Sequence, residues 1–120
     1  MSFDLSFWHE DQPITLDQAR HIYTRLCDDD STVVTAHPNV ALFLAELTRH
    51  YPAIDDVPED KLDDSPWSCA FSVTSGSAIV CMTWPAGTKL ASFVIQLAMQ
   101  HDLVCYDPQQ DAVHSPASLS

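Results

Sequence analysis

Glycine is scarce in this 120-residue chain, which contains only Gly76 and Gly87. Loops that cradle a phosphate group need several glycines close together, so this scarcity excludes the common nucleotide-binding loops. The Gly-x-Ser-x-Gly sequence of many serine hydrolases is also absent. Since no other catalytic signature is present, we expect a protein that is not an enzyme and that uses no cofactor.

Basic residues are scarce as well, with five Lys and Arg against 17 Asp and Glu and a formal net charge of −12. Contacts with a nucleic-acid backbone need cationic side chains, so we expect no binding to DNA or RNA. The excess of carboxylates favours a cationic partner, although the same charge also promotes solubility.

Long apolar runs are missing, and no stretch approaches the roughly 20 apolar residues that a membrane helix needs. The first residues lack the basic region followed by an apolar one that marks a secretory signal. We therefore expect a cytoplasmic protein that does not enter a membrane. The length fits one domain over residues 1–120, with a loose tail at about 115–120.

A strong hairpin pattern is present between Trp67 and Trp84. Large and small residues alternate on both sides of a turn at Ser75-Gly76, as in two antiparallel strands. A slip by one residue would mix the two faces of the hairpin, so the pattern favours a single register. On the apolar face this register pairs Val73 with Ala78, Phe71 with Val80, Cys69 with Met82, and Trp67 with Trp84.

Cysteines and histidines lack the spacing of a metal site. The four cysteines form no Cys-x-x-Cys pair and the six histidines form no His-x-x-x-His pair. In the predicted hairpin Cys69 and Cys81 point to opposite faces, so we interpret all four cysteines as small buried residues. The triplet His9-Glu10-Asp11 is the nearest approach to a cluster, and solvated or capping roles explain it better. We expect no bound metal.

The remaining elements follow from apolar spacing. Phe3, Leu5 and Phe7 alternate with other residues and predict a first strand with one buried face. A capping box at Thr15 begins a first helix, and Pro38 suits the first turn of a second. Further strands are expected at 103–106 and 112–114.

A third helix is expected to begin at the cap residue Thr88, after Pro85-Ala86-Gly87 has ended the hairpin. The element order then predicts an α+β fold, with helices one and three on the same face of the sheet. More specifically, it predicts a ferredoxin-like split βαββαβ antiparallel sheet with one extra helix after the first helix.

Residues 55–64 differ from the rest of the chain, and we call them the acidic segment. They contain six carboxylates with Lys61 as the only cation, and they lack strong periodicity. We expect an acidic loop with at most one helical turn, suited either to solubility or to a cationic partner. The six carboxylates are Asp55, Asp56, Glu59, Asp60, Asp63 and Asp64.

Two aromatic residues beside the acidic segment, Tyr51 and Trp67, are candidate anchors for a partner. Cross-strand packing between Trp67 and Trp84 in the core is the ordinary explanation for the tryptophans. The functional alternative is an exposed aromatic rim beside a negative loop, which is typical of protein-binding surfaces.

Several short blocks of the sequence resemble a family of small bacterial proteins. The blocks are Phe3-Asp4-Leu5 with Trp8, His37-Pro38, Tyr51-Pro52, Ser65-Pro66-Trp67, Trp84 and His101 to Gln109. By size, charge and expected fold, such proteins are similar to immunity proteins encoded beside polymorphic or type VI secreted toxins. The resemblance implies a binding protein that neutralises a cognate toxin, and it implies no catalytic residues.

Two other functions stay open. A secretion chaperone for an effector protein is also small and acidic, but it is usually a dimer that holds an unfolded segment. A small enzyme or metal protein is the second alternative, because a Cys–His nucleophile pair can form from residues distant in sequence. The oligomeric state and the toxin's activity do not follow from the sequence.

Overall fold

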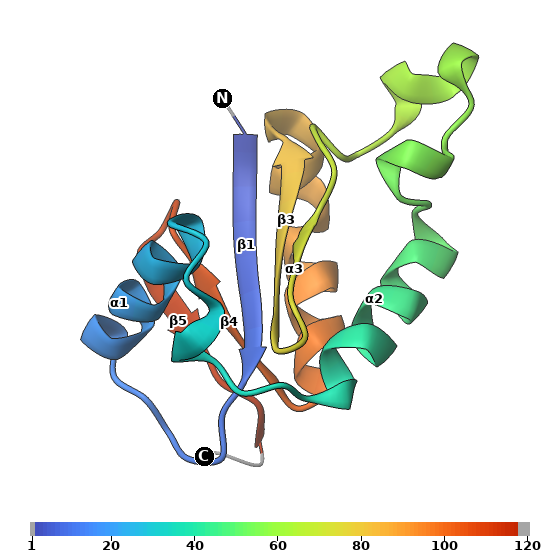
Figure 1. Ribbon diagram of the computed structural model, residues 1–120. Coiled ribbons are helices and arrows are strands. Elements are labelled where there is room, and N and C mark those ends of the chain that lie inside the picture. Colours follow the sequence, from blue (N-terminus) through green and yellow to red (C-terminus); the bar gives the residue numbers. More distant parts are fainter. Residues whose placement is uncertain (1, 118–120) are drawn as a thin grey trace.

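The computed structural model describes residues 2–117, which form a five-stranded antiparallel sheet in the order β2-β3-β1-β4-β5 (Figure 1). The α+β class and the short edge strand expected at 112–114 are thereby confirmed. The strands are β1 (Ser2–His9), β2 (Ser72–Val73), β3 (Ser77–Thr83), β4 (Leu103–Asp107) and β5 (Ala112–His114).

The first two α-helices begin where the sequence predicts. The backbone N–H of Gln18 donates to Thr15 Oγ1 at 3.1 Å, and the N–H of Thr15 donates to Gln18 Oε1 at 2.8 Å, so the capping box is complete. Pro38 occupies the first turn of the second helix. The helices are α1 (Leu16–Cys27), α2 (Pro38–His50) and α3 (Trp84–Gln100), with short 3₁₀ turns η1 (Ser31–Val33), η2 (Ile54–Asp56) and η3 (Glu59–Asp64).

Helix α3 begins four residues before the expected cap at Thr88. Strand β3 runs into the helix without a loop, and Thr83 is the N-cap. Pro85 lies in the first turn of the helix, where a backbone N–H has no hydrogen-bond partner within the helix. The absence of an N–H in proline therefore costs nothing here, and Pro85 helps to start the helix rather than ending the preceding element. Thr88 lies inside the helix, where its hydroxyl donates to the carbonyl of Pro85 at 2.9 Å.

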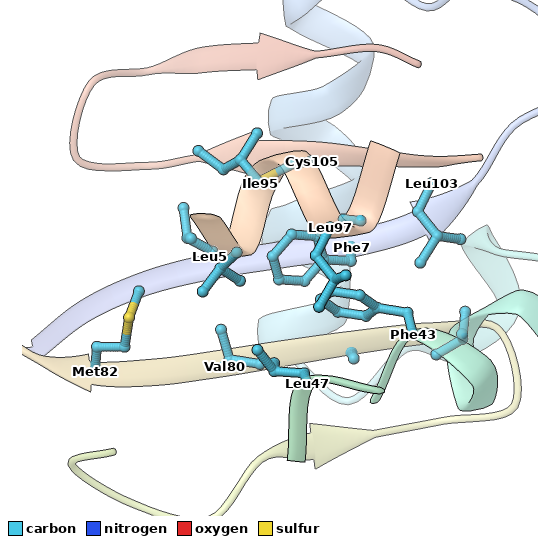
Figure 2. Close-up of a cluster of buried hydrophobic side chains, with 14 of the residues drawn as sticks. Leu5, Phe7, Phe43, Leu47, Val80, Met82, Ile95, Leu97, Leu103 and Cys105 are labelled. Atoms are coloured by element: carbon cyan, nitrogen blue, oxygen red, sulfur yellow. The ribbon is translucent and has the colours of Figure 1, made fainter. Parts of the chain in front are cut away.

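Helices cover both faces of the sheet, so the expectation that helices one and three share a face is wrong. Helices α2 and α3 pack on the face that carries Leu5, Phe7 and Val80 (Figure 2). Helix α1 packs on the other face, against Trp8 and Tyr106. Strand β1 is therefore buried on both sides. The alternation of apolar residues in its sequence did not reveal the second buried face, because Trp8 is the only large apolar residue on that face of the strand.

The core between the sheet and helices α2 and α3 is the larger of the two. Figure 2 shows Phe43 and Leu47 of α2 lying over Phe7 and Val80 of the sheet. The rings of Phe7 and Phe43 are 4.8 Å apart in a tilted arrangement that is favourable for aromatic pairs. This packing fixes the direction of α2 and therefore the position of the chain that follows it.

The hairpin register is confirmed near the turn and differs at the open end. Ser72 lies opposite Ile79 as expected, but Met82 pairs with Trp67 instead of Cys69. Three residues, 69–71, therefore lie opposite Val80 alone, which makes a bulge with two extra residues. A shift by two residues keeps every side chain on its original face, so the alternation cannot distinguish the two registers.

Both glycines sit where a side chain would not fit. A Cβ on Gly76 would lie 2.4 Å from the carbonyl oxygen of Thr35, and one on Gly87 would lie 2.2 Å from Cγ of Phe3. The hairpin turn is further joined to the start of α2, because the N–H of His37 donates to the carbonyl of Ser75 at 3.0 Å. The two glycines thus permit two close contacts between distant segments.

The expected loose tail lies partly outside the described residues, which end at Ala117. Within the described part, Pro116 is buried. No helix in residues 2–117 is long and apolar enough to cross a bilayer.

Candidate partner-binding surface

The acidic segment forms η2 and η3 and lies at one end of the molecule, beyond the end of α2 and away from the sheet (Figure 1). The principal-axis extents of the protein are 43 × 27 × 26 Å. All six carboxylates predicted as site residues are exposed, and each lies in or directly beside a 3₁₀ turn. Solvent and an approaching partner can therefore reach all of them.

The acidic segment has no internal neutralisation. In the described part of the chain, none of its six carboxylates forms an ion pair, whereas Asp17, Asp30 and Asp111 elsewhere each pair with an arginine. Lys61 is exposed and forms no ion pair among residues 2–117 either. The segment therefore presents uncompensated negative charge, which attracts cations over about 8–10 Å at moderate ionic strength.

Two contacts attach the acidic segment to the core. Ile54 packs against the large core at the start of η2. The indole N–H of Trp67 lies between two carbonyl oxygens that precede the segment, at 3.2 Å from that of Tyr51 and 3.0 Å from that of Pro52. Trp67 thus joins the chain that precedes the segment to the chain that follows it.

Trp67 is not available as a partner anchor, which corrects the sequence-based expectation. Its side chain is only 2% exposed, and it is packed edge-on against Phe71 with ring centroids 4.8 Å apart. Trp84 does not face it, because the bulge moves Met82 opposite Trp67 and because Trp84 belongs to α3. Trp84 is 41% exposed and rests on Phe3, so no joint aromatic rim exists.

Tyr51, the other candidate anchor, is half-buried at the end of α2. Its ring makes edge contacts with Trp67 at 6.5 Å and with Phe93 at 5.9 Å between centroids. These contacts hold the ring in place while part of it stays accessible. Of the two aromatic residues predicted, only Tyr51 can contact a partner directly.

Two grooves meet at Tyr51. The first, which we call the Tyr51 groove, has a volume of about 250 Å³ and lies between Tyr51 and the acidic segment. The second has a volume of about 330 Å³ and continues towards the start of α3. The Tyr51 groove is lined by Tyr51, Pro52, Asp56, Val57, Pro58, Lys61, Asp64, Ser65 and Pro66.

The structure brings together only part of the predicted site. Asp56 and Asp64 line the Tyr51 groove, and Asp63 and Asp64 line the second groove. Asp55, Glu59 and Asp60 are exposed but line neither. Sequence reasoning missed the apolar wall, which consists of Pro52, Val57, Pro58 and Pro66. The prolines interleaved with carboxylates were a signal for such a wall, because proline is apolar and rigid.

Two histidine rings are in contact at the end of β1. The rings of His9 and His37 are stacked with centroids 3.8 Å apart, and His9 Nδ1 is 3.7 Å from a carboxylate oxygen of Asp11. His37 Nδ1 accepts a hydrogen bond from the N–H of Asn39 and so caps α2. No group of three or more metal-ligating side chains in residues 2–117 is placed to hold a metal ion.

A charged network joins α1 to the turn between β4 and β5. Arg20 donates two hydrogen bonds to the carboxylate of Asp111, and the Tyr106 hydroxyl donates to the same carboxylate at 2.7 Å. These bonds lower the pKa of Asp111 from 3.8 to about 2, and those from Arg20 have the largest effect. The network fixes α1 to the sheet and lies away from the grooves.

The interpretation of all four cysteines as buried residues is wrong. Only Cys105 is fully buried, and Cys27 and Cys69 are exposed. Burial, and then a hydrogen bond with Cys69, raise the pKa of the Cys81 thiol. The two thiols are thus close to each other and do not lie on opposite faces as expected, because Cys69 belongs to the bulge at 69–71, where the regular alternation of faces is interrupted.

Comparisons of the chain with protein-family models, with curated proteins and with solved structures found no match.

Proposed function

We propose that this protein is an immunity protein that binds a cognate toxin and occludes its active surface. The observation that supports the proposal is the acidic segment, with six exposed carboxylates that form no ion pair in the described residues. Carboxylates so close together repel one another in the free protein, and a cationic surface would relieve that repulsion. A toxin whose substrate-binding cleft is positively charged provides such a surface.

The position of the acidic segment suits this role. The segment lies at one end of the molecule and away from the sheet, where a partner can approach it (Figure 1). The grooves at its base add apolar surface beside the charge. Charge of this kind mainly accelerates association, whereas buried apolar contacts slow dissociation.

We also infer that the fold is a variant of the split βαββαβ arrangement. The order β2-β3-β1-β4 and the placement of α2 and α3 on one face support this inference. In this interpretation α2 takes the place of the first crossover helix, and α1 is the added helix on the opposite face. The arrangement leaves the acidic segment, which lies between α2 and β2 in the chain, outside the sheet.

The proposal is tested with the products of the genes that flank the one encoding this chain. Each product is expressed in a bacterial host with and without the protein, and we expect one to arrest growth only in its absence. The purified pair should form a one-to-one complex with a folded toxin. A dimer that binds only an unfolded segment would instead identify a secretion chaperone. Flanking products that are all harmless would contradict the proposal.

The role of the charge is tested by replacing Asp55, Asp56, Asp60 and Asp63 with Asn. Association with the toxin should slow and lose part of its salt dependence, as measured by stopped-flow kinetics at two ionic strengths. The control replaces Asp28 and Asp29, at the end of α1, with Asn. If both variants lowered the association rate equally per removed charge, the net charge of the protein rather than the acidic segment would control association.

A further inference from the structure

The Tyr51 groove has the size of a site for one side chain. Its volume of about 250 Å³ lies below the roughly 300–1,000 Å³ of pockets that bind drug-sized molecules. It is formed by two pieces of chain that are close because Trp67 binds the carbonyls of Tyr51 and Pro52. A partner can therefore insert one long side chain here while the rest of its surface meets the acidic segment.

The wall of the groove is mainly apolar, and two acidic residues are among those that line it. Pro52, Val57 and Pro66 provide apolar wall surface, whereas Asp56 and Asp64 add two carboxylates. A side chain with an apolar stem and a cationic end, as in arginine and lysine, matches both the apolar wall and the carboxylates. The negative charge of the two carboxylates and of the acidic segment around them favours a cationic end over an acidic one.

We propose that the Tyr51 groove binds an arginine side chain of the cationic partner, an inference that rests on the proposed function. Arginine is favoured over lysine because its planar guanidinium stacks on aromatic rings and is more weakly hydrated. Tyr51 supplies the ring, held by its contacts with Trp67 and Phe93. The two carboxylates then accept hydrogen bonds from the donors of the guanidinium group.

Lys61 lines the same groove and is the one cation of the acidic segment. Its positive charge therefore opposes the approach of an incoming arginine to the groove. Its side chain is exposed and forms no ion pair in residues 2–117, so its removal leaves the fold unchanged. The variant Lys61→Ala should therefore bind an arginine probe more tightly than the natural protein does.

The probe is a pentapeptide with blocked, uncharged termini and one central arginine. Its binding is followed by the NMR chemical shifts of the full chain. We expect a Kd on the order of millimolar, with shifts confined to residues 51–66. Peptides with lysine or with neutral citrulline in place of arginine should bind about tenfold more weakly, the loss expected for one charge-assisted hydrogen bond.

Two matched pairs of variants distinguish the contribution of the groove to peptide binding from that of the surrounding negative charge. Asp56→Asn with Asp64→Asn should weaken binding of the arginine peptide about tenfold, and Lys61→Ala should strengthen it. Asp55→Asn with Asp60→Asn, which removes the same charge outside the groove, should have a much smaller effect. All these residues are exposed, so we expect the variants to fold.

Equal binding of the lysine peptide, shifts spread over other parts of the surface, or equal losses in the two pairs of variants would overturn the arginine proposal. These outcomes differ from failure of the proposed function, since the peptide assay needs no toxin. An arginine-binding groove without a toxin partner would retain the site and refute the immunity role. Neutralisation that is unaffected by Asp56→Asn with Asp64→Asn would retain the immunity role and refute the groove.

Discussion

The side-chain amide of Gln109 pairs with the backbone of Asp4, 105 residues earlier in the chain. The N–H of Asp4 donates to Gln109 Oε1 at 2.7 Å, and Gln109 Nε2 donates to the carbonyl of Asp4 at 2.7 Å. Strand β4 pairs with β1 only as far as Ser6, so Gln109 continues the ladder with a side chain. The same Nε2 also donates to the buried carboxylate of Asp107.

Replacement of Gln109 should therefore destabilise the protein more than its half-buried position suggests. Gln109→Ala leaves the N–H and the carbonyl of Asp4 without these partners, at a cost of about 1–3 kcal/mol in the free energy of unfolding. Gln109→Glu should cost more, because its carboxylate cannot donate to either oxygen and repels Asp107. Denaturant unfolding measures both, with the exposed neighbour Gln110→Ala as a control that stays within about 0.5 kcal/mol of the natural protein.

Helix α2 provides a matched pair of leucines that tests its packing on the sheet. Leu47 is 0% exposed and Leu42 is 56% exposed on the same helix. Leu47→Ala should lower the free energy of unfolding by about 2–5 kcal/mol, since it leaves a cavity against Val80 and Phe43. Leu42→Ala should change it by less than about 0.5 kcal/mol. Similar losses in both variants would mean that α2 turns a different face to the sheet.

The pKa of Asp111 predicts a specific dependence of stability on pH. Because this pKa is lowered from 3.8 to about 2, the ionised carboxylate stabilises the fold above pH 3.8, and that contribution is lost as the pH falls to about 2. Asp111→Asn keeps a residue that tolerates the positive φ of 51° at this position. Its melting temperature should lie below that of the natural protein at pH 6, and the difference should vanish near pH 2. A difference that stays constant over this range would exclude the ion pair with Arg20 as the cause.

The acidic segment should contribute nothing favourable to folding. Its carboxylates are exposed and form no ion pair in residues 2–117, so their mutual repulsion is a small cost to the folded protein. Replacement of Asp55, Asp56, Asp60 and Asp63 with Asn should leave the melting temperature unchanged or slightly raised at low salt. Differential scanning calorimetry with and without added salt measures this effect, and a clear loss of stability would indicate a structural role for the segment.

Sequence reasoning succeeded where a local signal has one structural solution. The capping box at Thr15, the proline at the start of α2 and the hairpin turn at Ser75-Gly76 are of this kind. It failed where two solutions satisfy the same pattern. The hairpin registers that pair Met82 with Cys69 or with Trp67 preserve the same faces, so only packing of the whole domain selects between them.

The exposure of the acidic segment was predicted from the sequence, but the shape of the surface around it was not. The six carboxylates are exposed as their crowding suggested, because unpaired charges stay in water. The apolar wall beside Tyr51 depends on how the prolines fold back against the end of α2, a tertiary contact with no short-range signal. Trp67 was proposed as an exposed anchor because it adjoins the acidic segment. In the structure its indole N–H binds the chain before that segment, and its side chain is buried.

The lengths of the outer strands have a consequence for self-association. The edges of the sheet are β2, with two residues, and β5, with three, whereas the central strands β1 and β3 have eight and seven. A long unpaired edge is a template on which other copies add strands and aggregate, and edges this short offer little of that template. Because its formal net charge of −12 repels approaching copies, the chain should remain dispersed at the high local concentrations reached during synthesis.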